Sequence, residues 1–248
     1  MKSKKSMVLI FLAVIFWSAG TAAGADVTVE TEVNSAYVWR GITFNDGMVV
    51  QPSVDVAVGN FGLNVWGNLD IDDYDETLDS GEFSEIDLTL TYAFDAGPVG
   101  LTAGYIEYLF PTTETGGAPG TREVFLDLGI TPAEGIATGI TGYYDFDEVE
   151  DYYLNVYINY GVLLDSGLGI DCSASAGYVG SDVSASGDAG FHEYTLTLGM
   201  GYDITDMIAV SAAIGYTDAI DGDVLPDVEA GGGQDVNFFG GAGIAFAF

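Results

Sequence analysis

Apolar and polar side chains alternate along most of the chain after residue 25. The stretch VTVETEV, from Val27 to Val33, places its valines on one face and Glu30 and Glu32 on the other. This period of two residues is typical of a β-strand whose faces meet different environments. No later segment shows a helical period, so the pattern predicts an all-β protein.

Twelve segments carry this alternation, and most are long for strands of globular proteins. We expect the first to run through VTVETEVNSAYVWRG, with Tyr37 and Trp39 on its apolar face and Arg40 on its polar face. Glu107 falls on the apolar face of the fifth segment, which indicates a bulge or register shift there. Such lengths suit tilted strands that cross a bilayer. The predicted strands cover residues 27–41, 48–59, 61–71, 83–95, 99–110, 123–131, 136–146, 152–162, 168–180, 192–203, 207–217 and 235–248.

The links between these segments alternate in length. Links after even-numbered segments are tight, such as GN and DITD, whereas most others are longer and acidic, such as DDYDETLDSGE. Outer-membrane barrels have short periplasmic turns and longer external loops, and an even strand count puts both termini on the periplasmic side. We therefore predict an all-β fold, a closed antiparallel up-and-down transmembrane β-barrel of about twelve strands, located in the cell outer membrane.

A soluble β-sandwich is the alternative, because any half-buried sheet sorts its charges onto one face. Three features favour the membrane. The apolar faces are nearly free of charge, aromatic residues gather near strand ends, and no lysine after residue 25 guards a sheet edge. A closed barrel needs no such guard because it has no edge.

The first 25 residues differ in character from the rest. Three lysines precede an apolar run from Met7 to Trp17, and Ala23-Gly24-Ala25 supplies small residues for cleavage. The run is too short to span a bilayer as a helix, which makes an uncleaved anchor the weaker alternative. We expect residues 1–25 to be a secretory signal peptide and residues 26–248 to form the barrel.

The charge balance is strongly acidic. The chain has 38 acidic residues, and the predicted cleavage leaves Arg40 and Arg122 as its basic ones. Such a chain excludes nucleic acid as a partner and attracts cations. Its aromatic and aliphatic content excludes intrinsic disorder, and a single cysteine, Cys172, allows no internal disulfide.

Several segments of the predicted barrel occur in an order typical of one family. They are YVWRGI (37–42), QPSVDV (51–56), LNVWGNLD (63–70), EIDLTLTYAF (85–94), GYIEYLFP (104–111), TREVFLDLG (121–129) and YYDFDE (143–148). Together they resemble the TorF-type porin family, and the C-terminal third matches least well. The resemblance implies an outer-membrane barrel that acts as a channel, and it implies little about the solute.

The polar strand faces should line the barrel lumen. Barrels of about 8 strands are filled by side chains and those of 16 to 18 leave an aqueous channel, so twelve strands with bulky inward residues predict a narrow or occluded bore. Strand direction places several inward acids and Arg40 near the external mouth, and carboxylate rings favour cations. Alternatively, Arg40 pairs with Glu85 or Glu123 and braces the wall. The predicted pore-lining residues are Arg40, Asp70, Glu85, Asp87, Glu123, Asp127, Asp145, Glu30, Glu32, Asp55 and Trp66.

No pattern in the chain indicates catalysis. His192 is expected on the lipid-facing side, out of reach of a nucleophile in the lumen, and Cys172 is interpreted as a small hydrophobe. There is no P-loop, dinucleotide fingerprint or zinc-ligand spacing. The carboxylates of DDYDETLDSGE could bind Ca²⁺, but EF-hand spacing is absent and a solvated acidic loop is favoured. We predict a protein that is not an enzyme and has no cofactor.

The chain ends on GAGIAFAF, in which Ile244, Phe246 and Phe248 share the predicted lipid face. This ending resembles the signal that barrel-assembly machinery recognises, so we expect that machinery, outer-membrane lipids and small cations or other small solutes as partners. The predicted function is a narrow, acidic, porin-like channel for passive diffusion with cation preference. The alternative is a barrel with a filled lumen and a structural or surface-interaction role through its acidic external loops.

Overall fold

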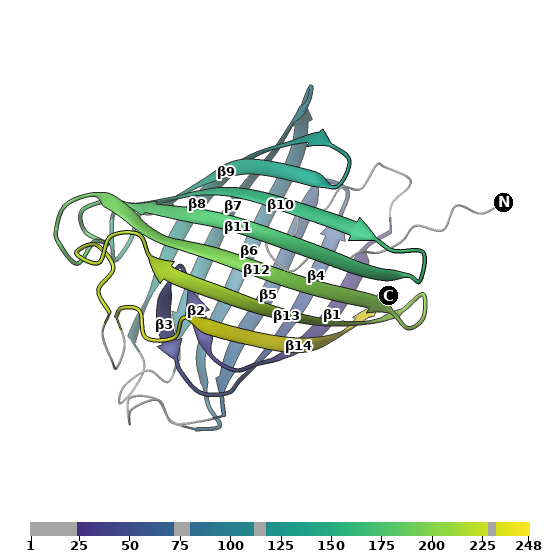
Figure 1. Cartoon of the computed structure of the whole chain (residues 1–248), viewed down its shortest axis with the longest axis horizontal. Helices are drawn as coiled ribbons and strands as arrows, with labels where there is room; N and C mark the ends of the chain where they lie inside the picture. Colours follow the sequence, from purple (N-terminus) through teal and green to yellow (C-terminus); the bar gives the residue numbers. More distant parts are fainter. Residues whose placement is uncertain (1–23, 72–79, 112–117, 228–231) are drawn as a thin grey trace.

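The computed structural model describes residues 24–71, 80–111, 118–227 and 232–248. These residues form a closed barrel of twelve antiparallel strands. The first strand begins and the last strand ends at the end with the tight turns, and the described parts of the longer connections lie at the other end (Figure 1). The barrel strands are β1 (Asp26–Asn34), β4 (Val49–Val58), β5 (Phe61–Asp70), β6 (Phe83–Ala96), β7 (Val99–Phe110), β8 (Ala118–Ala133), β9 (Ile136–Asp145), β10 (Tyr152–Leu163), β11 (Leu168–Val179), β12 (Gly190–Asp203), β13 (Ile208–Ala219) and β14 (Phe238–Ala247).

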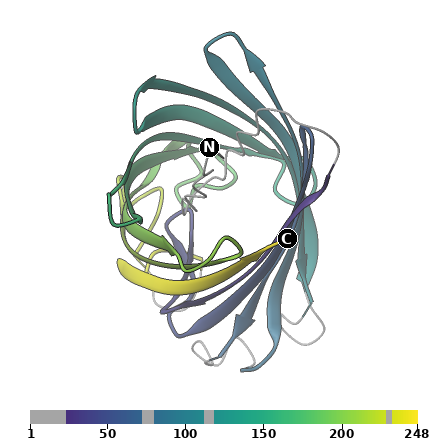
Figure 2. The same ribbon diagram turned by 90° about the vertical axis from the view of Figure 1, so that its right-hand side faces the viewer.

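The barrel closes because its last strand pairs with its first. Thr28 lies opposite Ala247, and the amide of Phe248 donates a hydrogen bond of 2.9 Å to the carbonyl of Val27. Closure pairs the backbone groups that an open sheet would expose at its edges, as a lipid environment demands. Figure 2 looks along the barrel and shows this ring of strands.

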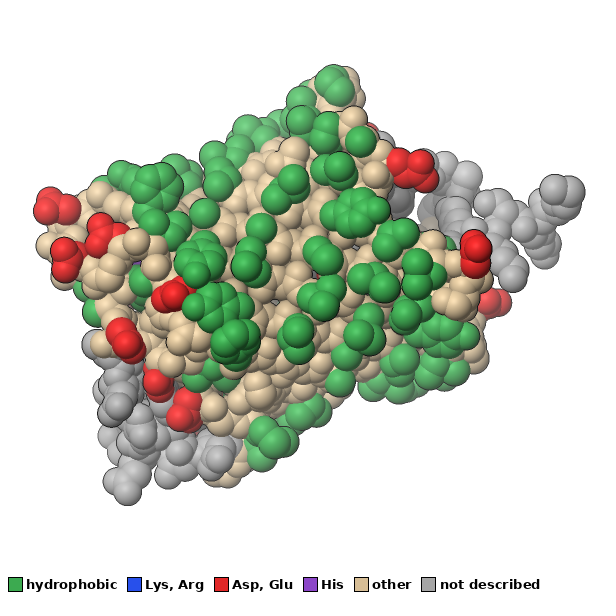
Figure 3. Space-filling view, in the orientation of Figure 1, with side chains coloured by type: hydrophobic (Ala, Val, Ile, Leu, Met, Phe, Trp, Pro, Cys, Tyr) green, Lys and Arg blue, Asp and Glu red, His purple; other side chains and the backbone are tan. Residues whose placement is uncertain are grey.

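Apolar side chains cover the outer wall. Ile158 and Leu196, for example, are each about half exposed, and the carboxylates visible in Figure 3 gather toward the two ends. Among the described residues, no helix has the length and apolar character needed to cross a membrane. An apolar belt around a closed barrel is the surface that such proteins present to lipid. The predicted fold class is confirmed, and the closed barrel with its apolar belt supports the predicted location in the outer membrane.

The first predicted strand was too long. The observed strand β1 ends at Asn34, and the residues that follow form a separate hairpin of β2 (Tyr37–Trp39) and β3 (Ile42–Asn45). Arg40 and Gly41 have φ of 50° and 79°, the left-handed pair that a tight two-residue hairpin turn requires. The prediction that Tyr37 and Trp39 face lipid is therefore wrong, because the chain leaves the barrel wall before it reaches them.

A second correction concerns His192. Phe191 pairs with Tyr178 and Tyr194 with Ala176, so two residues of β12 lie opposite one residue of β11. This bulge turns His192 inward, and its side chain is buried instead of facing lipid. The alternation of apolar positions alone could not reveal this shift.

Glu107 lies on the outer face, and a register shift follows it between Tyr108 and Phe110. Its carboxylate accepts hydrogen bonds from Tyr105 at 3.1 Å and from Arg122 at 3.4 Å. Arg122 also donates to Asp147 at 3.0 Å. An exposed charge cluster at the long-loop end thus accommodates this acid on the apolar face of β7.

The C-terminal residue should matter more for assembly than for conduction. Phe248 lies on the outside of the barrel wall and is 69% exposed, so Phe248→Ala removes a side chain that contributes little to packing. We expect a several-fold lower yield of folded protein in the outer membrane, measured by the different gel migration of boiled and unboiled samples. Phe238→Ala, which removes a similarly exposed ring at the other end of β14, is the control. Equal yields from both variants would contradict the assembly role.

Candidate functional site

The β2–β3 hairpin folds into the lumen at the long-loop end (Figure 1). Tyr37 donates its hydroxyl hydrogen to Glu85 at 2.8 Å, and the amide of Asn45 donates to Asp70 at 2.7 Å. Both contacts are buried and both acceptors belong to barrel strands. The hairpin is therefore attached to the wall by polar contacts along its length.

A second set of contacts attaches the hairpin to the connection between β13 and β14. The hydroxyl of Thr43 accepts hydrogen bonds from the backbone amides of Asp235 at 3.1 Å and Val236 at 2.9 Å. Thr43 also donates its amide to the carbonyl of Gly233 at 2.9 Å. Leu225 of the same connection is almost fully buried, and lies close to Gly41 at the hairpin tip. The hairpin and the described part of this connection therefore pack against each other in the outer lumen.

Arg40, at the hairpin tip, makes the most elaborate contact. Its two terminal nitrogens donate to the two oxygens of Glu123 at 2.8 and 2.7 Å. The guanidinium carbon lies 4.1 Å from the ring centre of Trp39, 4.4 Å from that of Tyr143 and 4.3 Å from that of Tyr153. A bidentate carboxylate and three aromatic faces are strong partners for a planar cation. Of the two carboxylates expected as partners for Arg40, Glu123 is the one observed.

Neighbouring side chains hold this arrangement in place. Tyr108 donates to Glu123 at 2.9 Å, and Tyr153 donates to Glu193. The Nδ1 atom of His192 lies 2.8 Å from the other oxygen of Glu193. Burial alone would lower the pKa of Arg40, but its hydrogen bonds with Glu123 and the charge of that residue raise this pKa above its usual value. The guanidinium therefore stays charged.

A cavity of about 450 Å³ lies in the lumen beside the hairpin. Trp39 and Arg40 of the hairpin line it, and Asp87, Tyr108 and Asn155 reach it from the barrel wall. One side-chain oxygen of Asp87 and that of Asn155 are buried and accept no hydrogen bond from the protein. The cavity thus presents both oxygen acceptors and aromatic side chains.

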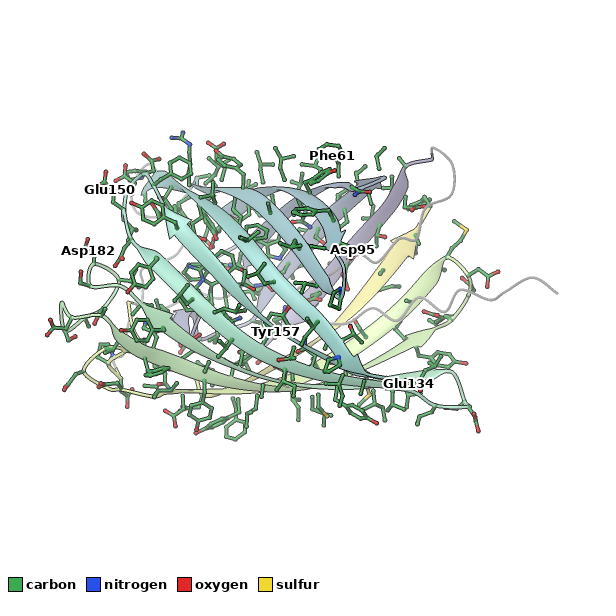
Figure 4. The ribbon with its side chains drawn as sticks, turned by 90° about the horizontal axis from the view of Figure 1, so that it is seen from above. Phe61, Asp95, Glu134, Glu150, Tyr157 and Asp182 are labelled. Carbon is green, nitrogen blue, oxygen red and sulfur yellow. The ribbon has the colours of Figure 1, made fainter. Side chains whose placement is uncertain are left out.

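The acids predicted to line the pore lie on the inner face, and most have polar partners. Asp55 accepts from Asn64 at 2.9 Å, and Asp127 accepts from Thr141 at 2.8 Å and Tyr157 at 3.0 Å. Figure 4 shows the two faces of the wall, with Phe61 on the outside and Tyr157 in the interior. The remaining predicted acids on this face are Glu30, Glu32, Asp70, Glu85, Asp87, Glu123 and Asp145, and Trp66 lies among them.

Some of these predicted residues support the hairpin or a loop. Asp70 and Glu85 hold the hairpin as described above, and the ring of Trp66 lies 5.5 Å from that of Tyr37. Asp145 accepts from Thr121 at 2.5 Å and from the backbone amide of Asp147 at 2.9 Å. These side chains therefore shape the outer lumen as well as charging it.

Sequence reasoning missed the aromatic side of the site. Tyr108, Tyr143 and Tyr153 face Arg40, but nothing in the alternation distinguishes them from other inward tyrosines. A usable signal was the Arg40-Gly41 pair, which follows a break in the alternation at residues 34–36 and has the glycine of a tight turn.

The possible Ca²⁺ loop lies mostly outside the described residues, since Asp72, Asp73, Asp75, Glu76 and Asp79 fall there. Within the described part of the chain, no group of three or more histidine, cysteine or acidic side chains is arranged to hold a metal ion.

Solved structures with the same fold include outer-membrane porins and channels. The NanC porin has a TM-score of 0.56 at 11% identity, covering 89% of this chain and 98% of its own. The KdgM porin in complex with disordered oligogalacturonate has a TM-score of 0.55 at 10% identity, covering 90% and 99%. An outer membrane channel from Pseudomonas putida F1 has a TM-score of 0.52 at 13% identity, covering 92% and 97%. Identities this low establish the fold alone.

Comparison by sequence identifies a family whose function is unknown. No curated protein matches the chain. A family model described as a bacterial protein of unknown function matches residues 18–225, which is most of the chain. The protein therefore belongs to the Gcw_chp family.

Proposed function

We propose that the protein is an outer-membrane channel for passive diffusion of small solutes, that its lumen prefers cations, and that the β2–β3 hairpin narrows it. The single observation that carries this proposal is the charge of the inner wall. Arg40 is paired with Glu123, so its charge does not offset the other acids on that wall. Carboxylates that line a narrow pore, with walls of low dielectric constant, attract cations and repel anions.

The fold supports a channel, but the solutes of proteins with similar structures cannot be assigned to this chain. The KdgM structure holds an oligogalacturonate, which is a chain of acidic sugars. An acidic wall repels such a polyanion, so we expect a different solute class here. The resemblance to TorF-type porins also supports a channel. Membership of the TorF-type family itself remains a prediction.

The second candidate is a barrel with a filled lumen that acts through its acidic loops. The observation in its favour is that the hairpin and the buried Val224 and Leu225 occupy the outer lumen. We propose a non-enzymatic protein in either case, because the buried His192 is engaged by Glu193 and is only 2% exposed. Lipids and the assembly machinery are the partners that both candidates would share.

Planar-bilayer recording under a KCl gradient separates the two candidates. We expect discrete conductance steps and a reversal potential of the sign set by K⁺, because the inner wall is acidic. Silence over many verified insertions would favour the filled barrel. A reversal potential of the Cl⁻ sign would contradict the cation preference and leave the channel intact.

A further inference from the structure

The pocket that receives the Arg40 guanidinium is built mainly by the barrel wall. Glu123 comes from β8, Tyr143 from β9 and Tyr153 from β10, and Tyr108 of β7 orients the carboxylate. Four consecutive strands therefore supply a carboxylate and two ring faces without any help from the hairpin. Trp39 adds a third ring from the hairpin itself.

The backbone conformation at Arg40 does not favour arginine. The contacts of the side chain therefore explain why an arginine occupies this turn. Its φ is 50°, in the left-handed region. The first central position of such a turn favours asparagine, aspartate or glycine, and an arginine there is strained. A strained residue persists when its surroundings compensate, and the contacts with Glu123 and the three rings provide that compensation.

The chemistry of the pocket selects a planar organic cation. Two parallel hydrogen bonds to one carboxylate match a forked guanidinium donor, and aromatic faces stack on its plane. A hard metal ion would need several oxygen ligands, whereas the charged ligand here is a single carboxylate.

We propose that the wall pocket formed by Glu123, Tyr143 and Tyr153 is a binding site for guanidinium-type organic cations, and that Arg40 occupies it as a tethered ligand. A solute of this class competes with Arg40 and releases the hairpin tip from the wall. As a statement about the permeating solute, this inference rests on the channel function proposed above.

Tethering determines how the competition should appear. A side chain attached through a short segment acts at an effective concentration in the millimolar range. Free guanidinium must exceed this effective concentration to displace Arg40 from the wild-type pocket. In a variant without the arginine side chain, the pocket has no tethered competitor. Arg40→Asn is the suitable variant, because asparagine is favoured in this turn and replaces the guanidinium and most of its aliphatic stem with a short neutral side chain.

The test is calorimetric titration of the folded full-length barrel in detergent with guanidinium chloride, using NaCl at equal ionic strength as the reference. We expect Arg40→Asn to bind guanidinium at least about tenfold more tightly than the wild type. The double variant Arg40→Asn/Glu123→Gln should lose this binding. Arg122→Asn, which removes the arginine on the outer face, should titrate like the wild type.

Equal affinity in the single and double variants would overturn the proposal. If Arg40→Asn does not fold, Arg40→Lys keeps a tethered charge without the planar fork, and guanidinium should then compete more easily than in the wild type. Bilayer recordings separate this inference from the channel function. Guanidinium binding without conductance would refute the channel alone, and cation-selective conductance without guanidinium binding would refute the pocket alone.

Discussion

Removing the β2–β3 hairpin should raise the single-channel conductance several-fold and keep the preference for cations. The hairpin occupies the outer lumen, and its removal also frees Glu123 from Arg40, so the wall becomes wider and more acidic. The register allows a clean excision. Asn34 lies directly opposite Val49, so residues 35–48 can be replaced by Asn-Gly, which closes two antiparallel strands tightly.

The measurement is bilayer recording, with gel migration before and after boiling as proof that the variant barrel is folded. Conductance and reversal potential report different quantities, since the first follows the bore and the second follows the wall charge. An unchanged conductance in a folded variant would show that the constriction lies elsewhere. A loss of cation preference would show that the hairpin, and not the wall, carries the selectivity.

Placing a charge on the outer face should destabilise the barrel strongly. Ile158 lies in the middle of β10, points away from the lumen and is 51% exposed. An arginine facing lipid near the bilayer midplane costs about 2–4 kcal/mol. We therefore expect Ile158→Arg to lower the free energy of unfolding by roughly that amount in lipid vesicles, measured by urea titration.

The matched control is the neighbouring residue on the other face. Asn159→Arg introduces the same side chain into the lumen, where water and carboxylates accept it, so stability should stay near that of the wild type. The same variant should weaken the cation preference in a bilayer. Equal destabilisation by the two substitutions would contradict the assignment of the two faces.

Much of the barrel follows from the sequence because the alternation of faces is a local property. The β7 strand from Val99 to Phe110 was predicted with its observed bounds, and most other strands differ by one or two residues. The sixth predicted strand was too short, since the observed β8 runs from Ala118 to Ala133. The last one began too early, since β14 starts at Phe238. Strand ends depend on pairing with neighbours, which the alternation does not contain.

The errors at Tyr37, Trp39 and His192 have a common physical cause. The alternation gives the face of a residue only while the chain stays in the wall and the register stays regular. A hairpin that turns inward keeps its alternation although it has left the wall, and a bulge changes the face of a single residue. Both events are defined by partners distant in sequence.

By itself, the sequence determined the all-β class, the transmembrane barrel, the acidic inner wall and the choice of two partners for Arg40. The tertiary structure alone decided that Arg40 leaves the wall on a hairpin and meets Glu123, 83 residues away in the chain. It also gathered Tyr143 and Tyr153 around the guanidinium. Side-chain alternation is set within a few residues, but a lumen is created only by closure, which brings distant strands to the same depth across the bore.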